Sequence, residues 1–113
     1  MKKPPRSDQA LLSDMIGFCE KVLSFTLNET FESFQKNEMC YMACLHAIVL
    51  LGEASTKVSK EIKLDNQKIP WRDMSDMRNM LVHWYHGLEL RFPWDTIKNE
   101  IPDVLEGLKK IKI

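Results

Sequence analysis

MCYMACLHAIVLL, residues 39–51, is the stretch that decides the fold, because apolar side chains occur on every side of the helix that it predicts. Asn37 offers an N-cap shortly before it. A helix that is apolar all round is buried all round, so in a small domain it lies between other helices or gives one side to a second subunit. His46 interrupts the run, which is too short to span a bilayer.

Helical patterns continue on both sides of this central helix, and no stretch alternates with the period of a strand. The sequence therefore predicts an all-α fold, an antiparallel four- to five-helix bundle that forms a dimer. The first six residues are expected to be a disordered tail, and residues 7–113 a single domain. Before the central helix we expect a helix over 7–26 capped by Ser7 and a short piece over 29–36 capped by Asn28. The central helix is expected to run to about Glu61, followed by a loop over 62–70 and a helix over 71–86 between Pro70 and Gly87. A last helix is expected over 93–111, opened by Pro93 and kinked at Pro102.

The composition excludes several classes of protein. Sixteen basic and sixteen acidic residues give no net charge, so no overall field attracts nucleic acid or a membrane surface, although a local basic patch stays possible. Three cysteines without C-x-x-C spacing indicate reduced, buried thiols. The first nine residues, MKKPPRSDQ, lack the apolar run of a signal peptide. We therefore expect a soluble, cytoplasmic protein.

Residues 71–94, WRDMSDMRNMLVHWYHGLELRFPW, contain the candidate site. Arg78, Asn79, His83, Tyr85 and His86 fall within one helical segment, where a small protein seldom places so many polar groups without a role. Arg78 and His83 are five positions apart, which is about 140° around an ideal helix. One copy therefore brings them together poorly, and a dimer that packs this helix against its mate would form a composite site.

The chemistry of this set suits cleavage of a phosphodiester. A histidine can take a proton from a ribose 2′-hydroxyl or give one to the leaving oxygen, while an arginine stabilises the negative charge on the phosphate. Asn79 could orient the imidazole of His83 or a phosphate oxygen, and this chemistry requires no metal. The alternatives are structural: an arginine in a surface ion pair, a satisfied histidine, Tyr85 as a core residue with its hydroxyl at the surface, and His86 at the negative end of a helix.

Other polar residues have simpler interpretations. Glu53 is one turn before Lys57 and forms an i,i+4 pair with it, or else it is a partly desolvated acid that supports the site. Cys40, Cys44 and His46 do not share a face and lack a fourth ligand, so no metal or cofactor is expected. Phosphate loops, dinucleotide-binding glycines and serine elbows are absent, which removes the common kinase, dehydrogenase and hydrolase classes.

Four segments of the chain resemble one known family. RNMLVHWY (78–85) resembles the R-N-x-x-x-H-x-Y signature of the HepT-like proteins of the HEPN superfamily. LLGEA (50–54), IPWRDM (69–74) and PWDTIKNEIP (93–102) are similar to further elements of that family, in the same order. The resemblance covers nearly the whole chain after the tail.

The resemblance implies a homodimeric helical bundle that is the toxin of a type VII toxin–antitoxin system. It implies a metal-independent endoribonuclease acting on mRNA or tRNA, in which Arg78 stabilises the pentavalent phosphate, His83 is the general acid or base and Asn79 supports them. The partner implied is an MntA-like minimal nucleotidyltransferase antitoxin that adds AMP to Tyr85. Such an adduct would block phosphate entry by its bulk and its charge.

Two residues depart from the family pattern, and two other functions compete with this one. Trp84 stands where relatives often have a small or polar residue, and His86 where they often have an aromatic one, which bears on the shape of the cleft and the substrate preference.

One alternative is a non-catalytic nucleotide- or substrate-binding subunit of a nucleotidyltransferase complex. The other is a helical dimer without a ligand, in which the signature serves packing.

Overall fold

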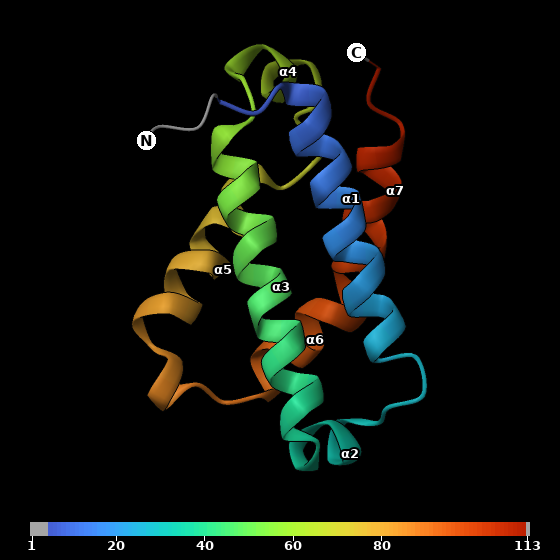
Figure 1. Ribbon diagram of the computed structural model, residues 1–113, viewed down its shortest axis with the longest axis vertical. Coiled ribbons are helices and arrows are strands. Elements are labelled where there is room, and N and C mark those ends of the chain that lie inside the picture. Colours follow the sequence, from blue (N-terminus) through green and yellow to red (C-terminus); the bar gives the residue numbers. More distant parts are fainter. Residues whose placement is uncertain (1–4, 113) are drawn as a thin grey trace.

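The apolar run of residues 39–51 lies in α3 (Glu38–Lys57), the central helix of the bundle. α1 (Asp8–Phe25) packs along one side of α3, and α5 (Trp71–His83) packs along the other (Figure 1). The structure, a computed structural model, describes residues 5–112. The prediction of a central helix between neighbours is confirmed.

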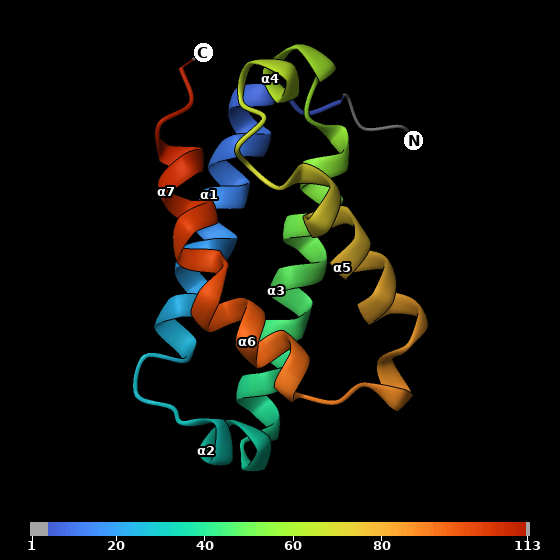
Figure 2. The ribbon, with the colours of Figure 1, turned by 180° about the vertical axis from the view of Figure 1, so that it is seen from behind.

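Short elements complete an all-α fold, as predicted, and residues 5–112 contain no strand. They are α2 (Phe31–Lys36), α4 (Lys60–Asp65), the 3₁₀ helix η1 (Tyr85–Gly87), α6 (Arg91–Asn99) and α7 (Ile101–Lys109). α7 lies against α1, and α6 lies across α3 on the side of the bundle that faces away in Figure 1 (Figure 2).

Two of the predicted helix caps are present. Ser7 Oγ accepts a hydrogen bond from the backbone N–H of Ala10 (3.1 Å), and Asn37 Oδ1 accepts one from the backbone N–H of Cys40 (3.1 Å). Each bond satisfies a first-turn N–H that has no partner within its helix. Of the predicted tail, residues 1–4 lie outside the described part of the chain, and Arg6 pairs with Asp14.

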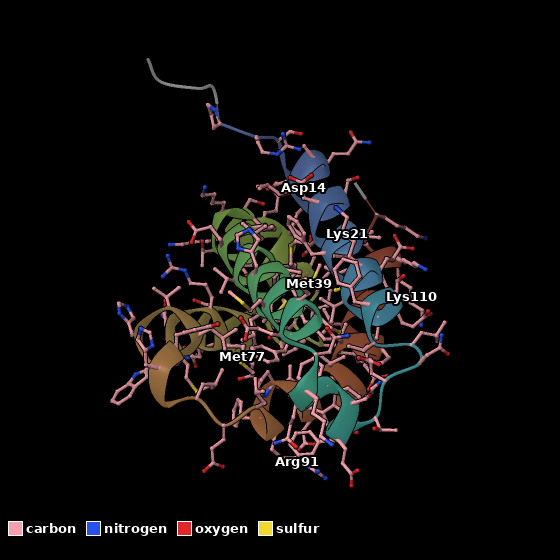
Figure 3. The ribbon with its side chains drawn as sticks, turned by 60° about the horizontal axis from the view of Figure 1, so that its bottom comes forward. Asp14, Lys21, Met39, Met77, Arg91 and Lys110 are labelled. Atoms are coloured by element: carbon pink, nitrogen blue, oxygen red, sulfur yellow. The ribbon has the colours of Figure 1, made fainter. Side chains whose placement is uncertain are left out.

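The prediction that Asn28 caps the short helix α2 is wrong. Thr30 is the cap: its hydroxyl accepts from the Ser33 N–H (3.1 Å), and the Ser33 hydroxyl accepts from the Thr30 N–H (2.8 Å). This reciprocal pair satisfies two N–H groups at once, which a single Asn28 side chain cannot do. α2 and the first turn of α3, with Met39, lie at one end of the bundle (Figure 3).

The predicted loop over 62–70 is partly helical, and the central helix ends earlier than expected. Val58 has extended backbone angles (φ −64°, ψ 142°), so α3 stops at Lys57. Ser59 then caps α4 with its hydroxyl, and its backbone N–H donates to Asp8 Oδ1 (2.9 Å). The connection is therefore tied to the start of α1.

The last two predicted helices also need correction. α5 ends at His83, because Trp84 leaves the helical region (φ −120°, ψ 18°), so Tyr85 and His86 lie in η1 rather than in the helix. The last helix begins at Arg91 and is divided at Glu100 into α6 and α7, instead of being kinked at Pro102. A proline has no N–H to donate, and its ring clashes with the carbonyl four residues earlier, so Pro102 suits the first turn of a new helix.

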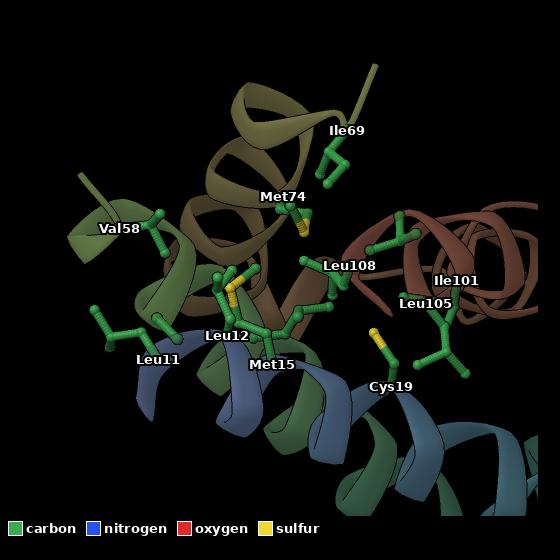
Figure 4. Close-up of a cluster of buried hydrophobic side chains, with 13 residues drawn as sticks. Leu11, Leu12, Met15, Cys19, Val58, Ile69, Met74, Ile101, Leu105 and Leu108 are labelled. Carbon is green, nitrogen blue, oxygen red and sulfur yellow. The ribbon is translucent and has the colours of Figure 1, made fainter. Parts of the chain in front are cut away.

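Two clusters of buried side chains form the core. The first lies among α1, α3, α5 and α7, with Met15 and Cys19 fully buried (Figure 4). The second joins α2, α3 and α6, where the ring of Phe34 packs against that of Trp94 at a centroid distance of 5.0 Å. The second cluster anchors the α2 end of the bundle.

By length and apolar composition alone, α3 is able to cross a membrane. It has 20 residues and a mean hydropathy of 1.4 over its most apolar stretch, so the full helix is longer than the apolar run of residues 39–51, which is too short to span a bilayer. The core helix of a soluble protein meets the same measure. The burial of α3 against α1 and α5 is the arrangement of such a core helix.

Candidate functional site

Gly52 allows α5 to lie directly on α3 at the site. A Cβ atom at this position would lie 2.6 Å from the Met74 carbonyl oxygen, and the Cβ of Arg78 would be closer than the 3.0 Å that real Cβ atoms keep. Only glycine therefore fits between the two helices. This contact fixes the start of the Arg78 side chain against α3.

Arg78 extends from this contact toward Glu53, the next residue along α3. Arg78 Nε lies 3.0 Å from Glu53 Oε2, but Nε makes no hydrogen bond with any residue of the described chain. The N–H is therefore poorly aligned with the carboxylate oxygen, and the contact is an ion pair without a directed hydrogen bond. Because 31% of the arginine side chain and 41% of the glutamate side chain are exposed, solvent screens the attraction to well below that of a buried pair.

Glu53 forms the predicted i,i+4 pair with Lys57 and also contacts Arg78. Its Oε1 lies 3.9 Å from Lys57 Nζ, one turn along the same helix, while Oε2 faces Arg78. One carboxylate therefore lies between two cations, and its charge is shared between them. The shorter contact is the one to Arg78.

Asn79 contacts Arg78 rather than His83. Arg78 Nη1 donates a hydrogen bond to Asn79 Oδ1 (3.0 Å). Together with the Glu53 contact, this bond occupies two sides of the guanidinium and leaves its remaining N–H groups without a side-chain partner among residues 5–112. Arg78, Asn79 and Glu53 thus form one group at the α3–α5 contact.

His83 and Tyr85 lie apart from this group, where α5 ends. His83 is the last residue of α5 and is exposed, and Tyr85 is 38% exposed in η1. The Tyr85 ring meets that of His86 edge to face at a centroid distance of 5.6 Å. Along an ideal helix, Arg78 and His83 are separated by about 7.5 Å and 140°. One copy of the chain therefore presents the two halves of the candidate site separately.

The cysteines behave as core residues. Cys19 and Cys44 are fully buried and unpaired, and burial raises the pKa of each thiol to about 12. Burial also raises the pKa of the partly buried Cys40. Thiols with raised pKa values are poor nucleophiles and poor metal ligands at neutral pH. His46 is exposed, and residues 5–112 hold no cluster of three or more potential metal ligands.

The steric role of Gly52 was not predicted, although the residue belongs to the LLGEA segment. The available signal was a glycine in the interior of a long helix, where it costs stability unless something approaches closely. The approaching helix is separated by more than a dozen residues in sequence, so the signal did not indicate its identity.

Comparison with known proteins places this chain in a family. The profile described as "Ribonuclease HepT-like" matches residues 15–111. The chain is 33% identical over 107 residues to the "Probable ribonuclease HepT" of Thermococcus cleftensis, covering 95% of this chain and 97% of that protein. It is 32% identical over 108 residues to the "Putative RNase MJ1216" of Methanocaldococcus jannaschii, covering 96% and 89%. No solved structure gave a significant match. The chain therefore belongs to the ribonuclease HepT-like family.

Proposed function

We propose that this protein is a metal-independent endoribonuclease that cleaves mRNA or tRNA in the cytoplasm at a site containing Arg78 and His83. The observation that carries the proposal is the arrangement of Arg78, which is fixed over Gly52, paired with Glu53, hydrogen-bonded to Asn79 and still partly open to solvent. A planar cation in this state suits an incoming phosphate. The names of the relatives agree with this activity.

The proposed reaction uses the ribose 2′-hydroxyl as the nucleophile. His83 takes the hydroxyl proton or protonates the leaving 5′-oxygen, as a bond forms from the 2′-oxygen to phosphorus and the bond from phosphorus to the 5′-oxygen breaks. Arg78 stabilises the extra negative charge on the phosphate oxygens in the transition state. Glu53 competes with the phosphate for the guanidinium, so its contact with Arg78 must loosen when RNA binds.

A homodimer is part of the proposal, since one chain presents Arg78 and His83 separately. The outer face of α3 carries Met39 and Met42, which are 86% and 48% exposed, and Val82 of α5 is 47% exposed. Met39, Met42 and Glu53 share the spacing of a helix-packing stripe, which ends at the Arg78 contact. A second copy on this face would cover the methionines and bring its own α5 toward Arg78.

We further propose that the protein is a toxin, neutralised when an MntA-like nucleotidyltransferase antitoxin adds AMP to Tyr85. The phenol is accessible and lies two residues after His83, in η1 just beyond the end of α5. A bulky anion at this position would occupy the approach to His83 and repel a phosphate. Modification would therefore block RNA cleavage without unfolding the bundle.

The test compares two substitutions in the site with two matched controls. Arg78→Ala and His83→Ala should each abolish growth arrest and RNA cleavage, while the purified variants keep the wild-type circular dichroism and oligomeric state. Arg72→Ala and Arg91→Ala should leave both activities near wild type, because these exposed arginines have the same chemistry as Arg78 outside the site. Undiminished cleavage by the His83→Ala variant would exclude the proposed acid–base role.

A second test addresses Tyr85. After co-expression with the antitoxin, intact mass should show AMP groups on the wild-type protein and none on Tyr85→Phe, which should stay toxic. Addition of AMP to the Tyr85→Phe variant would place the modification on another residue. A protein that never cleaves RNA yet binds nucleotide through Arg78 would instead support the non-catalytic subunit.

A further inference from the structure

A cavity of about 240 Å³ opens between α3, α5, α6 and α7, on a different side of α5 from Arg78. Its floor is apolar, made by Ile48 and Leu51 of α3 and Ile101 of α7, and Met77 and Met80 line its α5 wall. Methionine side chains adapt to the shape of what they contact. The volume suits one or two apolar side chains of a partner. No side chain of the bundle occupies it.

A second, shallower depression continues this cavity toward the candidate site. Met80 and Phe92 line both hollows, and Trp84 and Gly87 line only the second. The two hollows therefore adjoin, and together they extend from the start of α5 to Trp84 and Gly87, on either side of Tyr85; we call the pair the groove. Trp84 is 69% exposed and Phe92 is 53% exposed, so the groove leaves two large aromatic side chains in water.

The charges around this groove all have one sign. Asp73, Asp76 and Glu100 line the cavity, Glu89 lines its continuation, and neither hollow has a lysine, arginine or histidine in its lining. Asp76 lies 3.9 Å from an arginine, Arg72, whereas the other three carboxylates form no ion pair within residues 5–112. The groove thus has an apolar floor and an acidic rim in a chain with no net charge.

This charge pattern selects the class of occupant. RNA is repelled, because its phosphates would approach several uncompensated carboxylates. The face proposed for the second copy is also a different one: Asp73, Met77 and Met80 lie about 100–160° around α5 from Arg78 on an ideal helix. An amphipathic helix with apolar side chains flanked by lysine or arginine complements both the floor and the rim.

We propose that this groove docks a basic, amphipathic helix of the nucleotidyltransferase, with apolar side chains in the cavity and cations opposite Asp73 and Glu100. The identity of the partner rests on the proposed function, whereas the shape and charge of the groove are independent of it. Because the groove ends at Gly87, a helix bound along it places its enzyme beside Tyr85. RNA and the modifying enzyme would then use different faces of the same α5.

The test measures the affinity of the chain for its nucleotidyltransferase by isothermal titration calorimetry. It compares a variant with reversed charges in the groove with a control variant whose reversed charges lie outside it. Asp73→Lys combined with Glu100→Lys should weaken the complex at least about tenfold, since facing charges at interfaces commonly contribute that much or more. Asp103→Lys combined with Glu106→Lys is the control: both residues are exposed on α7 and outside the lining, and this variant should bind within about twofold of wild type. Both variants should keep the wild-type circular dichroism and RNA cleavage.

Each other outcome is informative. Equal affinity of the two variants would overturn the docking site while leaving the modification of Tyr85 intact. A change in the oligomeric state of the Asp73→Lys, Glu100→Lys variant alone, seen by sedimentation, would assign the groove to a second copy and overturn the proposal. Failure of the wild-type chain to bind the enzyme at all would remove the partner, and with it the proposed antitoxin, whereas RNA cleavage tests the ribonuclease separately.

Discussion

Replacing Gly52 by alanine should separate α3 from α5 and destabilise the protein. The added methyl group would meet the carbonyl oxygen of Met74 at 2.6 Å and the Cβ of Arg78. Neither atom belongs to the free end of a flexible side chain, so relief requires α5 to shift as a whole. The substitution therefore tests whether the contact of the two helices depends on the absence of a side chain at this position.

The expected magnitude combines two opposing effects. Overpacking costs about 1–3 kcal/mol, and its upper part applies here because the neighbouring atoms are fixed. The higher helix propensity of alanine raises the free energy of unfolding by about 0.5–1 kcal/mol. The net loss is about 2 kcal/mol, which corresponds to a Tm lower by about 8 °C in a domain of this size.

The matched control is Gly17→Ala, in the interior of α1. A Cβ atom there has nothing within 4 Å, so only the propensity effect remains, and Tm should rise by a few degrees. Thermal unfolding followed by circular dichroism measures both variants under the same conditions. A Gly52→Ala variant that melts at or above the Gly17→Ala variant would refute the steric argument.

Two further predictions concern the core and the thiols. Phe34→Ala removes a ring that is 0% exposed and should lower the free energy of unfolding by about 3–5 kcal/mol in urea titrations, with a much smaller loss for the partly buried Phe31→Ala. If the two losses are equal, the second core cluster does not depend on Phe34. Native-state alkylation with iodoacetamide at pH 8 should label Cys40 well before Cys19 and Cys44, and rapid labelling of all three would contradict their burial. Since the Cys19 and Cys44 thiols stay protonated in the folded chain up to about pH 12 but ionise near 9.0 in the unfolded chain, their contribution to stability is complete below pH 9 and is lost toward pH 12.

Local patterns in the sequence predicted most of the helical architecture. Ser7 and Asn37 cap their helices as expected, because a cap involves only its own first turn. The apolar run of residues 39–51 predicted a central helix, since a helix that is buried on several sides needs apolar residues on those sides. The family signature in turn identified Arg78 and His83, and the prediction of their catalytic roles remains to be tested.

The rest of the site depends on contacts between segments that are distant in sequence. Glu53 and Arg78 meet only because α3 and α5 pack closely, and the reason for that packing is a missing side chain at Gly52. The position of Tyr85 depends on the backbone angles of Trp84, where the residues of the signature still read as helix. Helical spacing therefore extended the predicted helix over Tyr85, which lies beyond the end of α5 in η1.

The ion pair at Arg78 has one more consequence. Because Glu53 offers its carboxylate oxygen without a directed hydrogen bond, it resembles the anionic oxygen of a phosphodiester that has not yet been fully engaged. In the proposed ribonuclease, Glu53 would therefore compete weakly with the substrate phosphate for Arg78. Small free anions must displace this carboxylate and gain little in doing so, whereas a polymer that makes contacts on both sides of the guanidinium can displace it. Selectivity for a long chain over free phosphate would then begin at this ion pair, before any base is recognised.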